Sequence, residues 1–384
     1  MEGFAFQLQT RVCFGVNEVF NIGNKCREYN AMRVFIVTDQ GVVEAGILEQ
    51  VKKVVNDAGI ETVVFDEVEP DPSLETVHRC ASRFREKNCD LILAVGGGSP
   101  VDTAKGARVV VENSGHIRDY AGVNKVPKAP AIPLIAVPTT SGTGSEVTMF
   151  AVLSDWENNM KITVASPYLA PELALVDPLL TLTAPPSVTA ASGIDALAHA
   201  IETYVSLKAQ PPAEVLALRA IELIGESLRP AVANGSDEEA RTKMSLGSLL
   251  AGMAFNNSLL GLTHSIGAAL SGHAHVRHGV AIGLLLPHVM EFNAMARLEK
   301  FRDIAVALGE DVRGLNLREA AFRSVKAVRE LVEDIALPRR LREVGVTEDM
   351  IESMTEDAMG HGMLKFNPRK ATEKDIVGIL RKAL

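Results

Sequence analysis

The sequence predicts an N-terminal α/β domain with a parallel sheet, followed by an all-helical C-terminal domain. In the first half, short apolar runs rich in β-branched residues alternate with segments of helical spacing, an order that is typical of a parallel sheet covered by helices. Beyond residue 187 nearly every segment has helical spacing. The pattern changes within TLTAPPSVTA at 181–190, so we expect the domains to be 1–183 and 184–384.

The individual elements follow from the same patterns. Buried strands are expected at 33–37, 61–65, 90–95 and 133–140, with helices at 42–57, 74–88 and from Pro100 onward. In the second half, helices are expected at 187–205, 212–229, 237–255, 259–271 and 281–296, with several more beyond.

Composition and charge narrow the class of protein. The chain has 384 residues, of which 47% are hydrophobic and 23% charged, and these values suit a soluble globular protein. Its net charge of −9 argues against nucleic acid or an anionic membrane as the main partner. The four cysteines form no CxxC pair and are expected to be free thiols. Without a signal-peptide pattern or an apolar run near the roughly 20 residues that span a bilayer, a cytoplasmic location is expected.

A glycine-rich turn follows the third expected strand, in LILAVGGGSPVDTAKG at 91–106. Ser99 as N-cap, Pro100 at the first helical position and Asp102 two residues later predict a capped helix. Three glycines exceed what a cap needs, and they let the backbone approach an anion at a helix N-terminus. We therefore favour a pyrophosphate site at Gly97, Gly98 and Ser99, although GxGxxG is absent and a capped helix alone stays open.

Two further features favour a dinucleotide. PTTSGTGSE at 138–146 follows a strand and offers the hydroxyl groups of Thr139 and Thr140, although an ordinary turn is equally consistent with this loop. Asp39 follows the strand RVFIVT at 33–38. An acid at the end of a strand can bind the adenosine ribose 2′-hydroxyl and would repel a 2′-phosphate. This position favours NAD over NADP, and the alternative is a surface turn acid.

Four side chains of the second half suit a metal ion. Asp195 and His199 are four residues apart in a strongly apolar helix, so both leave the same face. His264 lies in a second apolar helix, and His278 precedes the apolar run VAIGLLLP. One carboxylate and three imidazoles suit Fe²⁺ or Zn²⁺ with an open position for substrate. For Asp195 and His199 alone, a structural hydrogen bond is the alternative.

The motifs together resemble those of the iron-containing (group III) alcohol dehydrogenase family. They occur in the family's order: GGGSPVDTAKG, PTTSGTGSEVT, KITVASPYLAPELALVDPLLT, SGIDALAHAIE, AFNNSLLGLTHSIG, HGVAIGLLLPHV and NPRKATEKDI. The resemblance covers nearly the whole chain. It implies the dehydroquinate synthase-like fold, with a Rossmann-like N-terminal domain, a helical C-terminal domain and a cleft between them for NAD(P) and a divalent metal.

The resemblance also implies roles for individual residues. The metal ligands, which are also the catalytic set, would be Asp195, His199, His264 and His278. The cofactor site would comprise Asp39, Gly97, Gly98, Ser99, Asp102, Thr139, Thr140 and Lys161. The substrate pocket would include Phe150, Phe255 and His275.

Three departures from the family pattern bear on chemistry. Ala268 stands where many members carry a histidine that relays protons, so water, His273, His275 or a cofactor ribose hydroxyl must take that role. Phe150 stands where diol-active members can carry asparagine, which disfavours a 1,2-diol preference. His361 and Met363 stand where relatives often have aspartate and cysteine.

The expected function is a metal-dependent alcohol dehydrogenase or aldehyde reductase that uses NAD(H), with Fe²⁺ or possibly Zn²⁺, on a small primary alcohol or aldehyde. The alternatives are a related glycerol dehydrogenase or dehydroquinate synthase-like enzyme, or a NAD- and metal-binding protein without turnover. By the same resemblance we expect a homodimer or larger homo-oligomer.

Overall fold

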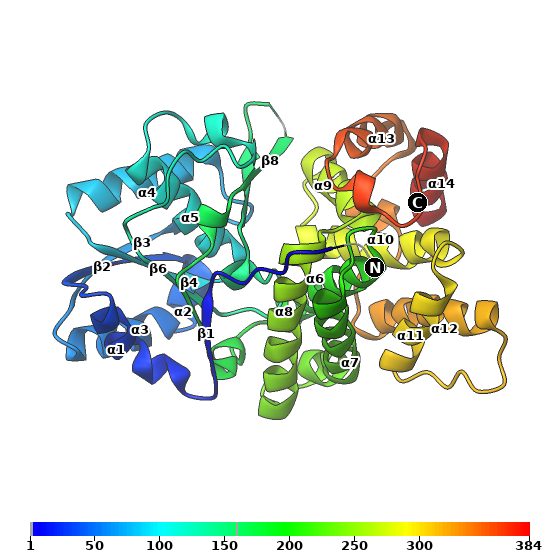
Figure 1. Cartoon of the computed structure of the whole chain (residues 1–384), viewed down its shortest axis with the longest axis horizontal. Helices are drawn as coiled ribbons and strands as arrows, with labels where there is room; N and C mark the ends of the chain where they lie inside the picture. The colour runs from blue at the N-terminus through cyan, green and yellow to red at the C-terminus, as the bar shows by residue number, and fades with distance from the viewer. Residues whose placement is uncertain (1–2, 159) are drawn as a thin grey trace. The chain divides into compact units, whose positions relative to one another are not determined.

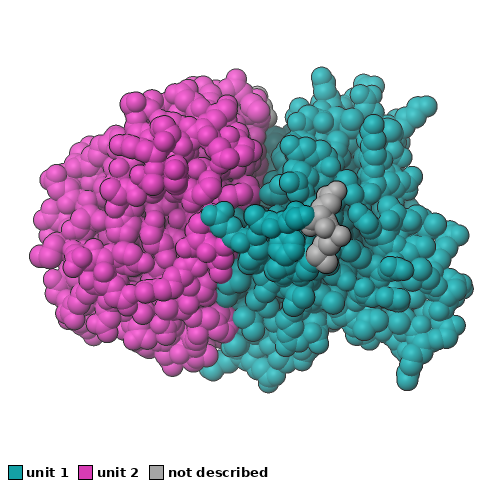
Figure 2. Space-filling model, in the orientation of Figure 1, with its two compact units in different colours: residues 1–7, 185–384 teal, residues 8–184 magenta. Residues whose placement is uncertain are grey.

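The computed structural model describes residues 3–158 and 160–384, and the chain divides into two compact units (Figure 2). One unit comprises residues 8–184, and the other comprises 185–384 together with residues 3–7. The N-terminal residues group with the helical unit because the backbone N–H of Gln7 donates to Asn257 Oδ1 at 2.7 Å, and Asn257 Nδ2 donates to the carbonyl of Gln7 at 3.1 Å.

The α/β unit contains a six-stranded sheet in the order β1-β9-β6-β4-β2-β3, and every pairing in it is parallel. The parallel sheet is therefore confirmed. Its strands are β1 (Arg11–Phe14), β2 (Arg33–Asp39), β3 (Glu61–Val68), β4 (Leu91–Gly96), β6 (Leu134–Pro138) and β9 (Leu173–Val176). The short strands β1 and β9 were not expected from the sequence, and they extend the sheet beyond β6.

Helices cover both faces of this sheet (Figure 1). Along β2, Val34 and Ile36 pack in one cluster with α1 (Ile22–Glu28) and α3 (Ile47–Asp57), whereas Phe35 and Val37 pack with α4 (Leu74–Glu86) and α5 (Gly98–Glu112). Because both faces are covered, the middle of β2, from Val34 to Val37, is a continuous apolar run. The expected helix 42–57 is in fact two helices, α2 (Gln40–Glu44) and α3, because Gly46 between them is left-handed with φ = 76°.

A smaller sheet was also missed. It has the order β5-β8-β7, with β5 (Gly122–Val123), β7 (Phe150–Asp155) and β8 (Met160–Ala165). Strands β7 and β8 are antiparallel neighbours, and this pairing carries Phe150 at the start of β7 and Lys161 near the start of β8.

The second unit is all-helical, as expected. Its helices are α6 (Pro186–Val205), α7 (Pro211–Ala233), α8 (Glu238–Ser258), α9 (Leu262–Ala274), α10 (His278–Ala294), α11 (Leu298–Ala307), α12 (Leu317–Asp334), α13 (Ile351–Gly360) and α14 (Glu373–Ala383). In the described part of the chain, none of the helices is long and apolar enough to cross a membrane.

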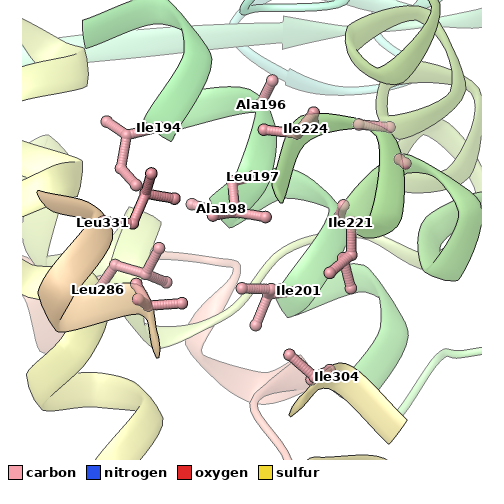
Figure 3. Close-up of a cluster of buried hydrophobic side chains, with 14 of the residues drawn as sticks. Ile194, Ala196, Leu197, Ala198, Ile201, Ile221, Ile224, Leu286, Ile304 and Leu331 are labelled. Atoms are coloured by element: carbon pink, nitrogen blue, oxygen red, sulfur yellow. The ribbon is translucent and has the colours of Figure 1, made fainter. Parts of the chain in front are cut away.

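Helix α6 lies in the middle of the main core of this unit. Its side chains Ile194, Leu197 and Ile201 are fully or almost fully buried and belong to one cluster with Ile221 of α7 and Leu286 of α10 (Figure 3). A helix that is apolar on most of its surface is buried by its neighbours. The few polar residues on α6 are therefore placed inside the protein, where they need partners.

Candidate metal centre and cofactor loops

Four predicted side chains from three helices meet inside the helical unit. Asp195 and His199 lie one turn apart on α6, His264 lies in the first turn of α9, and His278 is the first residue of α10. The Nε2 atoms of His264, His278 and His199 lie 3.4, 3.6 and 3.8 Å from the same atom, Asp195 Oδ1. Three imidazole nitrogens thus surround one carboxylate oxygen.

The centre fits a metal ion. Ligand atoms of Asp195, His199 and His264 all lie within 4.8 Å of one another, and the three residues are buried. Asp195 Oδ1 and His264 Nε2 are buried atoms without a hydrogen-bond partner among the described residues. Leaving such atoms unpaired costs free energy, and a cation between them would satisfy both. Carboxylate with imidazole is a donor set of Fe²⁺ and Zn²⁺ sites.

The electrostatics of the centre favour an ionised carboxylate. Burial by itself would raise the pKa of Asp195, but the surrounding His199, His264 and His278 lower it below its ordinary value. Burial likewise would lower the pKa of His264, but its contacts with Asp195 and Glu202 raise that pKa to about 9. A histidine must be neutral to bind a metal, so a cation at this centre would compete with a proton for His264.

Glu202 is a member of the centre that sequence reasoning missed. It is buried on α6, and its Oε2 accepts a hydrogen bond from His264 Nδ1 at 2.7 Å. The same carboxylate accepts from the backbone N–H groups of Gly261 and Thr263, at 2.9 and 2.5 Å. A carboxylate on Nδ1 orients the ring and directs the Nε2 lone pair to a metal. The available signal was a glutamate seven residues after Asp195 on an otherwise apolar helix.

Aromatic stacking orders the ligand rings further. The Phe255 ring on α8 stacks on His199 with centroids 4.6 Å apart, and His199 stacks on His264 at 4.7 Å. Phe255 thus lies beside the centre, and its role in the substrate pocket stays a prediction. Burial lowers the pKa of His361, which follows α13, and the charge of His264 lowers it further.

The remaining histidines of the α9 segment lie differently. His273 is still within α9, so the expected loop begins later, and His273 Nε2 forms a hydrogen bond with Asp357 Oδ2 at 2.6 Å. His275 caps the helix in a left-handed conformation, with φ = 52°, and is exposed. Ala268 lies on α9 one turn after His264 and has no group that can carry a proton.

In the α/β unit, the two predicted loops contact each other. They follow the paired strands β4 and β6, and the backbone N–H of Thr139 donates to the carbonyl of Gly96 at 3.0 Å. A Cβ added to Gly97 would lie 3.1 Å from Thr140 Oγ1, and one added to Gly98 would lie 2.7 Å from Thr143 Cγ2. Only glycine allows the loops to pack this closely while the N–H groups of the helix N-terminus stay accessible to an anion.

The predicted capping by Ser99 is wrong. Helix α5 begins at Gly98 with Gly97 as its N-cap, and no side chain caps it. Pro100 then lies inside the first turn, where its missing N–H has no intrahelical partner to lose. Asp102 forms no capping box. Its carboxylate accepts from Ser145 Oγ at 2.5 Å and from the backbone N–H of Val152 at 2.9 Å.

Asp39 lies where the strand order reverses. The chain places β3 on one side of β2 and then returns to place β4 on the other, and ligands of open parallel sheets bind at such a point. Asp39 ends β2, and its Oδ1 accepts from the backbone N–H of Val42 at 3.0 Å as the N-cap of α2. Its Oδ2 lies 3.3 Å from the position that a Cβ on Gly96 would take.

Two buried ionisable groups beside the loops were not predicted. Lys105 Nζ donates to Ser145 Oγ at 2.8 Å and to the carbonyl of Phe150 at 2.7 Å, and burial lowers its pKa to about 8. Burial raises the pKa of Glu146 to about 7. Lys161 is bound by Asp71, with Nζ and Oδ1 2.6 Å apart.

The two units thus combine a parallel-sheet domain, with small-residue loops at its switch point, and a helical domain with a candidate metal centre. Family models describe both parts: residues 9–178 match the iron-containing alcohol dehydrogenase model, and residues 189–384 match the C-terminal model of the Fe-containing alcohol dehydrogenase family. The chain belongs to this family, as the sequence motifs indicated.

Comparisons with individual proteins support the same family assignment. The chain is 40% identical over 370 residues to the NAD-dependent methanol dehydrogenase of Bacillus methanolicus, covering 96% of this chain and 97% of the relative. It is 41% identical over 372 residues to the 1,3-propanediol dehydrogenase of Klebsiella pneumoniae, with 96% of each chain covered. A crystal structure of a 1,3-propanediol oxidoreductase superimposes with a TM-score of 0.97 at 40% identity, covering both chains fully. The protein is an alcohol dehydrogenase of the iron-containing family.

Proposed function

We propose that the enzyme interconverts a small primary alcohol and its aldehyde at a divalent metal, Fe²⁺ or Zn²⁺, held by Asp195, His199, His264 and His278. The observation that carries the proposal is the convergence of three Nε2 atoms on Asp195 Oδ1, 3.4–3.8 Å away, inside a buried helical core. When bound, such a metal lowers the pKa of an alcohol hydroxyl or polarises a carbonyl oxygen.

The four ligands have unequal exposure, which suggests where substrate enters. The side chains of Asp195, His199 and His264 are 4–6% exposed, whereas that of His278 is 33% exposed. We infer that substrate approaches from the side of His278 and that Phe255 limits the space beside His199. Phe150 and His275 remain our candidates for the rest of the substrate pocket.

The proton that the alcohol releases needs a route to solvent. Because position 268 is alanine, no histidine at that point of α9 can carry the proton. His273 is engaged by Asp357, which leaves it a weaker candidate. We propose that water or the cofactor ribose hydroxyl carries the proton, with His275 as the remaining side-chain candidate.

The cofactor is proposed to bind at the switch point of the sheet. The backbone of Gly97, Gly98 and Ser99 would hold the pyrophosphate, with Thr139 and Thr140 beside it, and Asp39 would accept from the adenosine ribose. NAD is the hydride carrier in this arrangement. Asp102 and Lys161 would lie at the edge of the cofactor site and support its loops. Asp102 accepts hydrogen bonds from Ser145 and Val152, and Lys161 pairs with Asp71.

The proposed substrate class rests on the relatives named for methanol and 1,3-propanediol. Both alcohols are short and unbranched and carry primary hydroxyl groups. We propose a short primary alcohol or its aldehyde. We also propose that the enzyme acts in the cytoplasm as a homodimer or larger homo-oligomer, as the family resemblance implies.

The test is aldehyde-dependent oxidation of NADH by protein stripped with a chelator and reloaded separately with Fe²⁺ and with Zn²⁺, using a panel of short neutral and acidic aldehydes. Turnover restored by one ion supports the metal assignment and identifies that ion. Tight NADH binding without turnover under either ion would overturn the proposed chemistry and favour a binding role.

A further inference from the structure

The backbone N–H groups at the start of α9 donate to side chains from other parts of the chain. The first N–H groups of a helix have no intrahelical acceptor, and here those of Gly261, Leu262 and Thr263 are buried. Glu202 accepts from Gly261 and Thr263, and Oδ1 of Asn367 accepts from Leu262 at 3.2 Å. Two side chains from distant parts of the sequence thus hold the three residues that precede His264.

Asn367 itself is fixed in one orientation. It is 2% exposed, and it begins the NPRKATEKDI motif, to which the proposed chemistry assigns no role. Its Nδ2 donates to Asn293 Oδ1 at 2.7 Å and to the carbonyl of Arg369 at 2.6 Å. Its Oδ1 accepts from Asn293 Nδ2 at 2.9 Å as well as from Leu262. A flipped amide would place its NH₂ group against two donors.

These contacts join the helices that carry the metal ligands. Asn293 lies near the end of α10, the helix that begins with His278. The same helix end is held by Arg369, which donates to the carbonyl of Phe292 at 2.9 Å and stacks 4.0 Å above its ring. Asn367 therefore connects the start of α9 to α10, whereas Glu202 connects it to α6.

Gly261 shows how tightly the two side chains converge. A Cβ at this residue would lie 2.9 Å from Asn367 Oδ1 and 3.3 Å from Glu202 Oε1. Real Cβ atoms essentially never approach another atom as closely as the first of these distances. The backbone at 261 is thus accessible to both acceptors only because it carries no side chain.

We propose that Asn367 is a positioning residue for the metal ligand His264. It fixes the first turn of α9, so that His264 Nδ1 meets Glu202 and His264 Nε2 faces Asp195. Asn293 acts through Asn367 by holding its amide. This inference rests on the metal site of the proposed function.

The primary experiment compares Asn367→Ala with Thr355→Val. Thr355 is buried on α13, and its hydroxyl donates to the carbonyl of Ile351 in the same helix, so it serves as a control for general damage to this region. Affinity for Zn²⁺ is measured by competition with a chelator, and the visible absorption of the Co²⁺-loaded enzyme reports ligand geometry. Loss of an outer partner of a metal ligand weakens binding by about 10- to 100-fold. We expect about tenfold for Asn367→Ala, with an altered Co²⁺ spectrum, and neither change for Thr355→Val.

A milder variant covers the case in which Asn367→Ala fails to fold. Asn293→Ser leaves Asn367 in place but removes the partner of its amide, so we expect a weakening of Zn²⁺ affinity in the same direction and of roughly two- to fivefold. If the residues act in series, the double variant loses no more affinity than Asn367→Ala alone, because coupled sites are not additive. Unchanged Zn²⁺ affinity and Co²⁺ spectra in the single variants would overturn the proposal.

His264→Ala separates this proposal from the proposed function. If His264→Ala retains full Zn²⁺ affinity, the metal assignment itself fails. If His264→Ala loses the metal while the Asn367 and Asn293 variants keep it, the metal site stands and only the positioning role is overturned.

Discussion

The proposed metal centre and the proposed cofactor loops would each hold a charged ligand, but they would do so in opposite ways. In the helical unit, buried side chains supply charge and lone pairs, and Glu202 and Phe255 hold His264 and His199 in place. In the α/β unit, the backbone supplies the N–H groups, and the absence of side chains at Gly97 and Gly98 makes room. The first site should fail when a charge is removed, and the second when a methyl group is added.

The largest effect is expected from Asp195→Asn. The change keeps the shape of the side chain but removes the negative charge that three imidazoles face, so the divalent ion loses its only carboxylate ligand in the proposed set. Since metal polarisation supplies several kcal/mol, we expect kcat/KM to fall by at least about a thousandfold. Metal content is measured by elemental analysis, and the NADH affinity should stay unchanged.

Asp334→Asn is the matched control, because Asp334 is an exposed helical carboxylate that pairs with Arg229 on the surface. It should keep full metal content and activity. Asp195→Asn enzyme that retains its metal and turns over normally would contradict the assignment of this centre.

The second effect is expected from Gly98→Ala, which tests the other half of the comparison. The added methyl would lie 2.7 Å from Thr143 Cγ2, so the two loops must separate where the pyrophosphate is proposed to bind. We expect the Kd for NADH, measured by fluorescence titration, to rise by about 100-fold, or roughly 2.7 kcal/mol. Metal content should stay at the wild-type level.

Gly15→Ala provides the control in the same unit, since a Cβ there would meet nothing within 4 Å. Equal NADH affinity in Gly98→Ala and Gly15→Ala would place the cofactor elsewhere. The opposite responses of Asp195→Asn and Gly98→Ala, one losing metal and the other NADH, would establish that the two sites fail independently.

The two regions also differed in how far the sequence predicted them. Asp195 and His199 could be paired because their spacing matches one helical turn, and His264 and His278 followed from the density of histidines in apolar segments. Glu202 could have been noticed as a glutamate on an apolar helix, but its partners and those of Asn367 could not be predicted. These partners lie 59–62 residues from Glu202 and 105 residues from Asn367 and meet them only through tertiary packing.

In the α/β unit, the order of strands and helices predicted the parallel sheet, but β1 and β9 are only four residues long, too short for their spacing to separate strand from helix. The position of the glycine turn was predicted correctly, but the residue that caps the following helix was not. Serine before proline is a strong sign of a helix start, but here Gly97 adopts the extended N-cap conformation itself and the helix begins one residue before Ser99.

A smaller effect is expected from Asp39→Ser. Serine keeps an oxygen that can accept from the N–H of Val42 and so cap α2, but it removes the charge that would repel a 2′-phosphate. We expect the ratio of kcat/KM for NAD to that for NADP to fall about tenfold. Asp39→Gly would confound this result, because it removes the cap as well. A ratio that does not move would mean that Asp39 only caps the helix.

The smallest effect on catalysis is expected from Glu146→Gln, whose consequence lies in stability. Burial raises the pKa of Glu146 from 4.5 to about 7, so the folded state holds a proton that the unfolded state releases between these values. The resulting stabilisation is complete below pH 4.5 and is lost as the pH rises through 7, an effect on the order of 3 kcal/mol. Glutamine cannot ionise, so this loss of stability should disappear in the variant.

The measurement is urea unfolding at pH 5, 6 and 7, followed by the fluorescence of the single tryptophan, Trp156, which lies in the same unit as Glu146. The exposed Glu86→Gln change should leave the wild-type pH dependence intact. If Glu146→Gln leaves it intact too, the carboxyl group is ionised inside the fold, and the cofactor loops, like the metal centre, rest on a buried negative charge.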